Sequence, residues 1–225
     1  MRVSSGVEFI DKLIDGGYED DVITTIYGPP GAAKTNFCLL AMAALTDKNK
    51  KILYVDTEGS FSLARFKQVC PNYEEVLERT IFLTPTTYVE QKEAFEFMRK
   101  AVDDKFGLII IDSIASLYRL ELGVSNDIQN VNRELGLHMA MLTEIARKKH
   151  IPVILTNQVY TDFDDRERTR SIGGDTVKYW SRAMLEIQKV RGDLRKVTIT
   201  KHRSIKEGNF ILFRIVQTGL EEVQG

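Results

Sequence analysis

Residues 28–35, which read Gly-Pro-Pro-Gly-Ala-Ala-Lys-Thr, constrain the fold of this chain more than any other segment. An apolar run precedes them at residues 22–27, and a helix-like stretch follows at residues 36–45. A glycine-rich turn between a strand and a helix is typical of the phosphate-binding loop, or P-loop. The backbone N–H groups of such a turn and the helix N-terminus attract phosphates. The segment therefore predicts nucleotide binding on an α/β scaffold, against the simpler alternative of a Pro/Gly turn before a helix.

Two side chains and one departure define the expected chemistry of this loop. Lys34 would reach the β- and γ-phosphates of ATP, and the Thr35 hydroxyl would ligate Mg²⁺. The usual pattern has glycine before the lysine, whereas this chain has Ala33. A methyl group there makes a positive φ costlier, so we expect nucleotide binding to persist and turnover to be the weaker property. The predicted nucleotide-binding residues of the segment are Gly28, Pro29, Pro30, Gly31, Ala32, Ala33, Lys34, Thr35 and Asn36.

Composition excludes several classes of protein. Hydrophobic residues make up 43% and charged residues 28% of the 225 residues, the proportions of an ordinary soluble globular chain. No apolar run approaches the ~20 residues of a membrane span, and the first six residues lack the apolar segment of a signal peptide. Cys38 and Cys70 have neither metal-type spacing nor a disulfide framework. We therefore expect a cytoplasmic protein in a reducing interior, without a membrane partner.

Charge is unevenly distributed along the chain, although the net charge is only −1. Between residues 178 and 206, nine Lys/Arg stand against two acids, which makes this segment strongly basic. A basic end on an otherwise acidic domain suits a polyanion such as DNA, or a nucleotide held at a subunit boundary. Solvated charges on exposed strand faces are an equally good explanation of the same counts.

Short apolar runs alternate with helical patterns through most of the chain. The runs lie at residues 22–27, 51–56, 80–83, 108–112 and 151–156, and the helical patterns at 34–46, 61–69, 89–102 and 127–150. This alternation indicates a parallel sheet buried on both faces. Beyond Gly174, strand-like runs at 183–190, 196–201 and 209–216 predict an antiparallel extension. The expected fold is a single α/β domain over residues 1–225, a P-loop NTPase core whose mainly parallel twisted sheet is flanked by helices.

Polar side chains follow three of these runs, where the carboxyl ends of parallel strands form ligand sites. Asp112 ends an apolar run in the Walker B pattern and would hold Mg²⁺ through water. Glu58 would orient and deprotonate the attacking water, unless it is simply a helix N-terminal acid favoured by the macrodipole. Asp56 is interpreted as a structural partner. Gln158 would donate a hydrogen bond to the γ-phosphate. Loss of the phosphate would then change the order of the loop that follows.

A charged loop is expected at residues 159–172, closed by Ser-Ile-Gly-Gly at residues 171–174. A loop of this length in a compact domain is either functional or disordered. Single-stranded nucleic acid would contact its arginines and stack on Phe163 or Tyr160. Four acids in the same loop argue against tight sequence-independent binding. The predicted DNA contacts here are Arg166, Arg168 and Arg170.

The order of these motifs resembles the ATPase core of the RecA/RadA recombinases, over essentially the whole chain. The specific parts are Asp-Thr-Glu-Gly-Ser-Phe at residues 56–61 and Thr-Asn-Gln at residues 156–158. The resemblance implies a RecA-like fold with ATP and Mg²⁺ as cofactors. It makes Glu58 the catalytic carboxylate and Gln158 the phosphate sensor, acting with Lys34 of the P-loop.

The same resemblance assigns further residues. Arg65 matches the arginine that stacks on adenine, and residues 160–172 match the second DNA-binding loop. Residues 117–131 match the first DNA-binding loop and its flank, with Arg119 as their only clearly basic residue. Near the C-terminus, Lys201 and Arg203 match cations of core-only RecA-like ATPases that reach the γ-phosphate of a neighbouring subunit. The alternative for this pair is a strand-edge basic cluster that blunts aggregation.

Differences between this sequence and the full recombinases indicate which kind of family member to expect. The chain starts at the core, without the N-terminal DNA-binding domain or the Phe-x-x-Ala-type linker of full recombinases, and resembles short archaeal paralogues. With Ala33, this implies an accessory protein of DNA repair and homologous recombination that binds DNA, has weak ATPase activity and performs little or no strand exchange. The implied partners are single-stranded or branched DNA, a RadA-type recombinase, a Holliday-junction-processing nuclease and a second copy of the chain, in a nucleoid-associated location.

Two other functional classes stay open at this point. One is a DNA-stimulated ATPase that acts directly as a recombinase, against which Ala33 and the acidic loop count. The other is a KaiC-like signalling ATPase that assembles as a ring, with which Lys201 and Arg203 are compatible. A dehydrogenase is excluded, because Lys-Thr at residues 34–35 replaces what a dinucleotide fingerprint requires.

Overall fold

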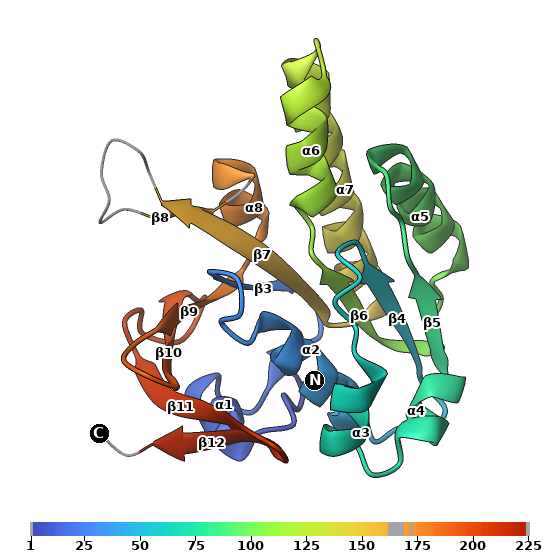
Figure 1. Cartoon of the computed structure of the whole chain (residues 1–225). Helices are drawn as coiled ribbons and strands as arrows, with labels where there is room; N and C mark the ends of the chain where they lie inside the picture. The colour runs from blue at the N-terminus through green and yellow to red at the C-terminus, as the bar shows by residue number, and fades with distance from the viewer. Residues whose placement is uncertain (1, 162–168, 172, 224–225) are drawn as a thin grey trace.

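A mostly parallel sheet with an antiparallel extension forms the centre of the structure (Figure 1). The computed structural model describes residues 2–161, 169–171 and 173–223. The strand order is β12-β11-β10-β9-β3-β7-β6-β4-β5, and β8 pairs with β7. The neighbours from β9 to β5 pair in parallel, whereas β9, β10, β11 and β12 pair antiparallel in succession. The strands are β3 (Ile23–Gly28), β4 (Lys51–Asp56), β5 (Thr80–Leu83), β6 (Phe106–Asp112), β7 (Val153–Thr161), β8 (Thr169–Ser171), β9 (Ala183–Lys189), β10 (Leu194–Lys201), β11 (Phe210–Val216) and β12 (Gly219–Val223).

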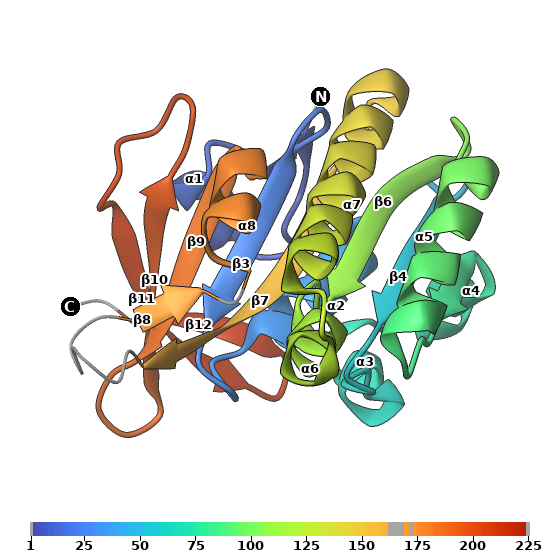
Figure 2. The ribbon, with the colours of Figure 1, turned by 90° about the horizontal axis from the view of Figure 1, so that it is seen from above.

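Helices cover both faces of this sheet (Figure 2). One face packs against α1 (Glu8–Leu13), α2 (Lys34–Ala44), α3 (Leu63–Val69) and α4 (Tyr73–Glu78), and the other against α5 (Tyr88–Ala101), α6 (Ser116–Val124), α7 (Ile128–Lys149) and α8 (Gly174–Trp180). Alternate strand residues enter opposite cores, as the period of two requires. In β4, Tyr54 joins the first core and Val55 the second. Both faces are therefore buried, which is why the strands are continuous apolar runs.

Local capping chemistry sets where several helices begin. The side chains of Ser62, Thr87 and Asp127 accept hydrogen bonds from backbone N–H groups in the first turns of α3, α5 and α7. The cap of α2 is different, because Ala33 is left-handed and makes no side-chain cap hydrogen bond. The first N–H groups of α2 are thus suited to an external acceptor such as phosphate.

Ion pairs fasten the N-terminal segment to the antiparallel extension. Strands β1 (Arg2–Val3) and β2 (Tyr18–Glu19) form a small antiparallel sheet of their own. The Glu19 carboxylate is paired with Arg2 at 3.2 Å and with Arg203, which follows β10, at 2.9 Å. Arg203 also contacts Asp21 at 3.0 Å. Because the Glu19 side chain is only 8% exposed, these two cations offset the cost of burying its charge.

The predicted parallel core and antiparallel extension are confirmed, and the differences lie at surface elements. Strand β7 continues to Thr161, because β8 pairs with its second half, with Val159 opposite Ser171. Helix α6 and the start of α7 take up most of residues 117–131, the range expected to hold a DNA-binding loop and its flank. Strand β12 had no clear apolar pattern, since it is an edge strand with exposed glutamates. In the described part of the chain, no helix is long and apolar enough to span a membrane.

Candidate nucleotide site

Two positive φ angles shape the P-loop between β3 and α2. Gly31 has φ of 69° and Ala33 has φ of 99°. A Cβ on Gly28 would lie 2.2 Å from the carbonyl oxygen of Ile187, so only glycine fits where β3 meets β9. Ala33 holds a left-handed conformation that costs a residue with a Cβ about 1 kcal/mol. The strain that the sequence predicted at Ala33 is therefore present in the fold.

Lys34 places a buried ammonium group inside the loop. Its Nζ donates to the carbonyl oxygens of Gly28 at 2.9 Å and Pro29 at 3.1 Å, and the residue is only 9% exposed. Burial lowers the pKa of Lys34, an effect opposed by the more distant carboxylates of Glu58 and Asp112. The ammonium thus has neutral oxygens as its immediate partners. An incoming phosphate would supply the anion that this position favours.

Asp112, at the end of β6, is a buried carboxylate surrounded by hydroxyl groups rather than by cations. It is 2% exposed. Four hydroxyls from four parts of the fold donate to its oxygens: Thr35 at 2.8 Å, Ser60 at 2.9 Å, Tyr54 at 3.0 Å, and Thr156. The predicted metal residues Thr35 and Asp112 are therefore in direct contact with each other.

The oxygen ligands that Thr35 and Asp112 offer fit a Mg²⁺ ion that is bound together with a nucleotide. Mg²⁺ is commonly bound by one or two protein oxygens, waters and substrate phosphates, rather than by an all-protein cage. Among the residues that the structure describes, no group of three or more His, Cys, Asp or Glu could hold a metal by itself. The Thr35 hydroxyl and the Asp112 carboxylate lie beside a phosphate-binding loop. They therefore match a Mg²⁺ site made of one or two protein oxygens, waters and substrate phosphates.

Glu58 follows β4 and is tied to the ends of two neighbouring strands. Its Oε1 accepts hydrogen bonds from Ser113 Oγ at 2.5 Å and from Gln158 Nε2 at 2.9 Å. Ser113 follows β6, and Gln158 lies in β7. The parallel register, in which Asp56 lies opposite Asp112, brings these strand ends together. The carboxylate expected to activate water and the amide expected to sense phosphate are thus direct neighbours.

Asp56 has the structural role that the sequence indicated. Its two oxygens accept the backbone N–H groups of Ser60 and Phe61, each at 3.0 Å. These bonds close the turn that carries Glu58 from β4 into α3. The side chain is thereby fully engaged with backbone, which leaves Glu58 as the carboxylate available for water.

Arg65, in α3, lies beside the first turn of α2. Its Nε donates to Asn36 Oδ1 at 2.8 Å, which brings together two residues predicted to bind the nucleotide. Its terminal nitrogens donate to the carbonyl oxygens of Gln217 and Gly219 at 2.9 and 3.0 Å. The guanidinium is thus held between the P-loop helix and the turn from β11 to β12.

Comparison with known proteins is consistent over nearly the full chain. The Rad51 family profile matches residues 1–223. The DNA repair and recombination protein RadB of Methanococcus maripaludis (strain C7) is 42% identical over 214 residues, with 94% of this chain and 97% of that protein covered. The chain belongs to the RadB proteins of the Rad51 family.

Two further RadB proteins extend the comparison. The RadB protein of Thermococcus kodakarensis is 37% identical over 228 residues, covering 99% of this chain and all of that one (100%). A crystal structure of the RadB recombinase matches with a TM-score of 0.83 at 34% identity, covering 99% and 100% of the two chains. The RecA-like fold expected from the motifs is therefore confirmed. Membership of the Rad51 family implies that this RadB-type chain is a nucleotide-binding protein of DNA repair and recombination.

In this Rad51-family chain, the two cations predicted to act in trans have different surroundings. Arg203 is engaged with Glu19 and Asp21, and its hydrogen bond to Asp21 raises its pKa. Lys201 donates to the carbonyl oxygen of Lys178 at 2.5 Å, and burial lowers its pKa. Arg203 thus holds the N-terminal segment within the same chain, whereas Lys201 has no carboxylate partner in the described residues.

The predicted DNA contacts are only partly described. Arg119 is exposed on α6, which lies beside α7 (Figure 1). Arg166 and Arg168 lie outside the described residues. The backbone of Arg170 belongs to β8, and its side chain is not described. Near Arg119, the exposed side chains Leu120 and Val124 make this surface more apolar than a typical phosphate-binding face.

Residues that position Asp112 were missed by sequence reasoning. Tyr54 is an internal residue of β4 and read as an ordinary strand position, whereas Thr156, in β7, belongs to the recognised Thr-Asn-Gln segment at residues 156–158. Ser60 lies within the recognised Asp-Thr-Glu-Gly-Ser-Phe segment, and its place in that segment was the sequence signal that could have identified it as a site residue. Ser113, which directly follows Asp112, likewise contacts Glu58 although no role was predicted for it.

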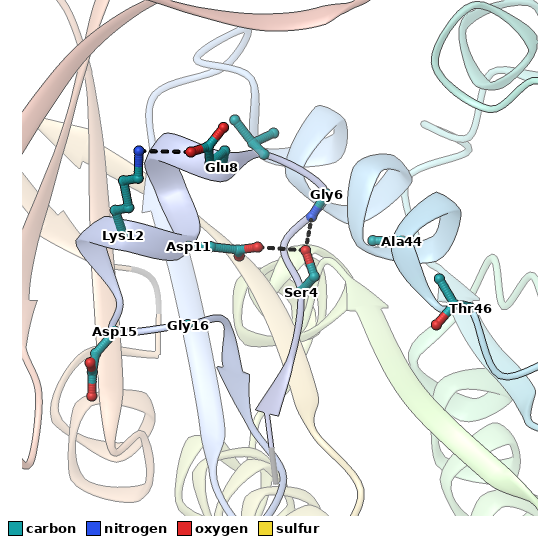
Figure 3. A pocket seen from close by; sticks show the side chains of 10 residues that line it. Ser4, Gly6, Glu8, Asp11, Lys12, Asp15, Gly16, Ala44 and Thr46 are labelled. Carbon is teal, nitrogen blue, oxygen red and sulfur yellow. Dashed lines mark hydrogen bonds and ion pairs between the residues drawn. The ribbon is translucent and has the colours of Figure 1, made fainter.

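A separate groove of ≈ 830 Å³ lies at the opposite end of α2 (Figure 3). Its acidic side chains are satisfied within the fold: Asp11 accepts from Ser4 Oγ at 2.5 Å, and Glu8 pairs with Lys12 at 2.7 Å. Ala44 and Thr46 line it at the C-terminal end of the helix, about 16 Å from the P-loop end at 1.5 Å per residue. The groove is therefore distinct from the nucleotide site.

Proposed function

We propose that this chain is an ATP-binding accessory protein of DNA repair and homologous recombination, with weak Mg²⁺-dependent ATPase activity. It binds single-stranded or branched DNA, performs little or no strand exchange and regulates a RadA-type recombinase or junction processing, for example by a Holliday-junction nuclease. The observation that carries the proposal is the convergence of Lys34, Thr35, Asp112, Glu58 and Gln158 at the carboxyl ends of four neighbouring strands. Relatives that bear the name DNA repair and recombination protein support the biological context.

Each of these side chains has a definable part in hydrolysis. Lys34 neutralises charge on the terminal phosphates, and the N–H groups at the start of α2 bind their oxygens. Thr35 and Asp112 would hold Mg²⁺, which supplies a positive charge that stabilises the phosphate oxygens. Glu58 accepts a proton from the attacking water, and Ser113 orients its carboxylate. Gln158 donates its amide toward the phosphate end of the site.

The left-handed Ala33 supports slow turnover. Its backbone holds a strained positive φ of 99° at the loop position directly before Lys34. A loop of this kind binds phosphate through its N–H groups but positions it less well for in-line attack. A slow ATPase suits a regulator whose nucleotide state lasts, better than it suits a motor.

DNA binding and self-association are the further parts of the proposal. The basic segment from residue 178 to 206 supplies an electrostatic footprint for a polyanion. Arg119 and the arginines of the loop after β7 are the proposed DNA contacts. Lys201 is the residue proposed to reach a neighbouring subunit, because its ammonium lacks a carboxylate partner in the described part of the chain. A cytoplasmic, nucleoid-associated location follows from this role.

Steady-state ATP hydrolysis with Mg²⁺, with and without single-stranded DNA, tests the proposal, together with direct measurement of ATP affinity. Clear ATP binding with slow turnover that DNA leaves unchanged is the expected result. Lys34→Ala should abolish ATP binding, because it removes the only lysine inside the loop. The matched control is Lys206→Ala, an exposed lysine outside the site.

Two results would redirect the assignment. Fast turnover that DNA stimulates would make the chain a recombinase in its own right, as the name of the solved RadB recombinase suggests for that protein. Nucleotide-dependent ring assembly with phosphorylation of the chain would instead point to a KaiC-like signalling ATPase.

A further inference from the structure

The hairpin from β9 to β10 runs along one side of the P-loop. At Gly28 the approach is between backbones, since a Cβ there would lie 2.2 Å from the Ile187 carbonyl oxygen. Three residues further along the P-loop, the carbonyl oxygen of Gly31 accepts a hydrogen bond from Arg195 Nη2 at 3.3 Å. A Cβ built on Gly31 would lie 3.1 Å from Lys189 Nζ. The hairpin therefore brings two cationic side chains to the tip of the loop.

No carboxylate among the residues that the structure describes neutralises the ammonium of Lys189. Lys189 is exposed and forms no ion pair with any carboxylate in the described part of the chain. Its charge acts on Lys34, whose pKa it helps to lower, so the two ammonium groups repel each other across the loop. Convergence of like charges is unfavourable unless an anion lies between them.

Glycine at position 31 keeps the space between the hairpin and the loop open. Any side chain there would meet the Lys189 ammonium, and the φ of 69° disfavours residues with a Cβ. Arg195 holds the loop at the same residue through its carbonyl oxygen. Its Nε is buried and finds no acceptor among the residues that the structure describes. The Lys189 ammonium and the Nε of Arg195 therefore present positively charged N–H donors on the hairpin side of the loop.

We propose that Lys189 binds the terminal phosphates of the nucleotide within its own chain, as a second ammonium group opposite Lys34. The inference rests on the proposed ATP-binding function and adds a residue from outside the P-loop to that site. Lys34 reaches the phosphates from inside the loop, whereas Lys189 approaches from the hairpin. Because its charge acts on the β- and γ-phosphates, it favours nucleoside di- and triphosphates over monophosphates.

Binding titrations with Mg-ATP and with AMP on the full chain test this role. Lys189→Gln should weaken ATP binding about tenfold, the effect of one charge-assisted hydrogen bond, and change AMP binding less than twofold. Lys189→Arg keeps the charge and should stay within about threefold of the unsubstituted chain. Arg191→Gln removes the same charge from the same hairpin, at an exposed residue without a contact to Gly31, and should change ATP binding less than twofold.

The controls separate this inference from the proposed function. If the unsubstituted chain binds no ATP, both are overturned. If it binds ATP, loses binding with Lys34→Ala and keeps full affinity with Lys189→Gln, only the role of Lys189 is overturned. Equal weakening by Lys189→Gln and Arg191→Gln would also overturn it, since a diffuse basic field would then explain both. Thermal unfolding of each variant within about 2 °C of the parent excludes a folding defect.

Discussion

Gln158 Nε2 donates a hydrogen bond to Glu58 Oε1 at 2.9 Å, across 100 residues of sequence. The expected phosphate sensor and the expected base therefore share one contact at the ends of β7 and β4. Since Ser113, directly after β6, donates to the same oxygen, Glu58 is held by one donor that follows β6 and one donor in β7. A change at either strand end would be transmitted to this carboxylate. Beyond Gln158, β7 leads directly into the segment expected to contact DNA.

Substitution Glu58→Gln is expected to keep ATP binding and to remove hydrolysis. The amide preserves size and polarity but cannot accept a proton from water, and loss of a general base costs on the order of 100-fold or more in rate. Single-turnover hydrolysis and an ATP titration measure the two properties separately. Glu207→Gln, at an exposed position outside the site, is the control. Hydrolysis at the normal rate in Glu58→Gln would show that the base is another residue.

Substitution Gln158→Met is expected to slow hydrolysis while changing ATP affinity less than about threefold. It removes the amide that contacts Glu58 with little change in side-chain volume. Because residues acting as one unit are not additive, the double variant with Glu58→Gln should be no slower than Glu58→Gln alone. Gln188→Met, on the exposed end of β9, controls for the chemical change. Fully additive losses would mean that the two side chains act independently.

Substitution Ala33→Gly is expected to stabilise the fold by about 1 kcal/mol, because glycine adopts the φ of 99° without a Cβ penalty. Chemical denaturation measures the gain. Turnover should rise if the methyl group limits it, and unchanged turnover would attribute slow hydrolysis to oligomeric state instead. Ala32→Gly is the matched control: Ala32 is buried and lacks a positive φ, so that change should destabilise by roughly 0.5–1 kcal/mol.

Stability is expected to fall between pH 7 and pH 5 because of His138. This residue of α7 is 7% exposed and stacks on Phe95 with ring centroids 4.1 Å apart. Burial, helped by Lys92 and opposed by Glu96, lowers its pKa to about 4. The unfolded chain, with a histidine pKa of about 6.5, therefore binds a proton that the folded chain excludes, and stability is lost as pH falls through that window. The loss attributable to this group is about 2 kcal/mol at pH 5.

Denaturation of His138→Leu at the two pH values isolates this effect. The variant has no proton to bind at this position, so the difference in unfolding free energy between pH 7 and pH 5 should shrink by about 2 kcal/mol. Substitution of the exposed His150 by Leu is the control for the chemical change from histidine to leucine. An undiminished difference in His138→Leu would place the acid sensitivity elsewhere.

Local sequence patterns were sufficient for the strands, the main helices and the P-loop. Apolar periodicity and the spacing from Gly28 to Thr35 depend on residues close together in the chain, so both can be recognised from the sequence alone. The order of the motifs was also enough to recognise the family. The same reasoning singled out Ala33, since a missing glycine at a turn has a local steric meaning.

Tertiary structure alone decided which of these residues meet. The donors Tyr54 and Thr156 reach Asp112 because β4, β6 and β7 are neighbours in register, and strand order is not a local property of the sequence. Arg203, expected to reach another subunit, binds Glu19 and Asp21 of its own chain for the same reason. Contacts between segments far apart in sequence depend on how the sheet assembles, and only the folded chain specifies that assembly.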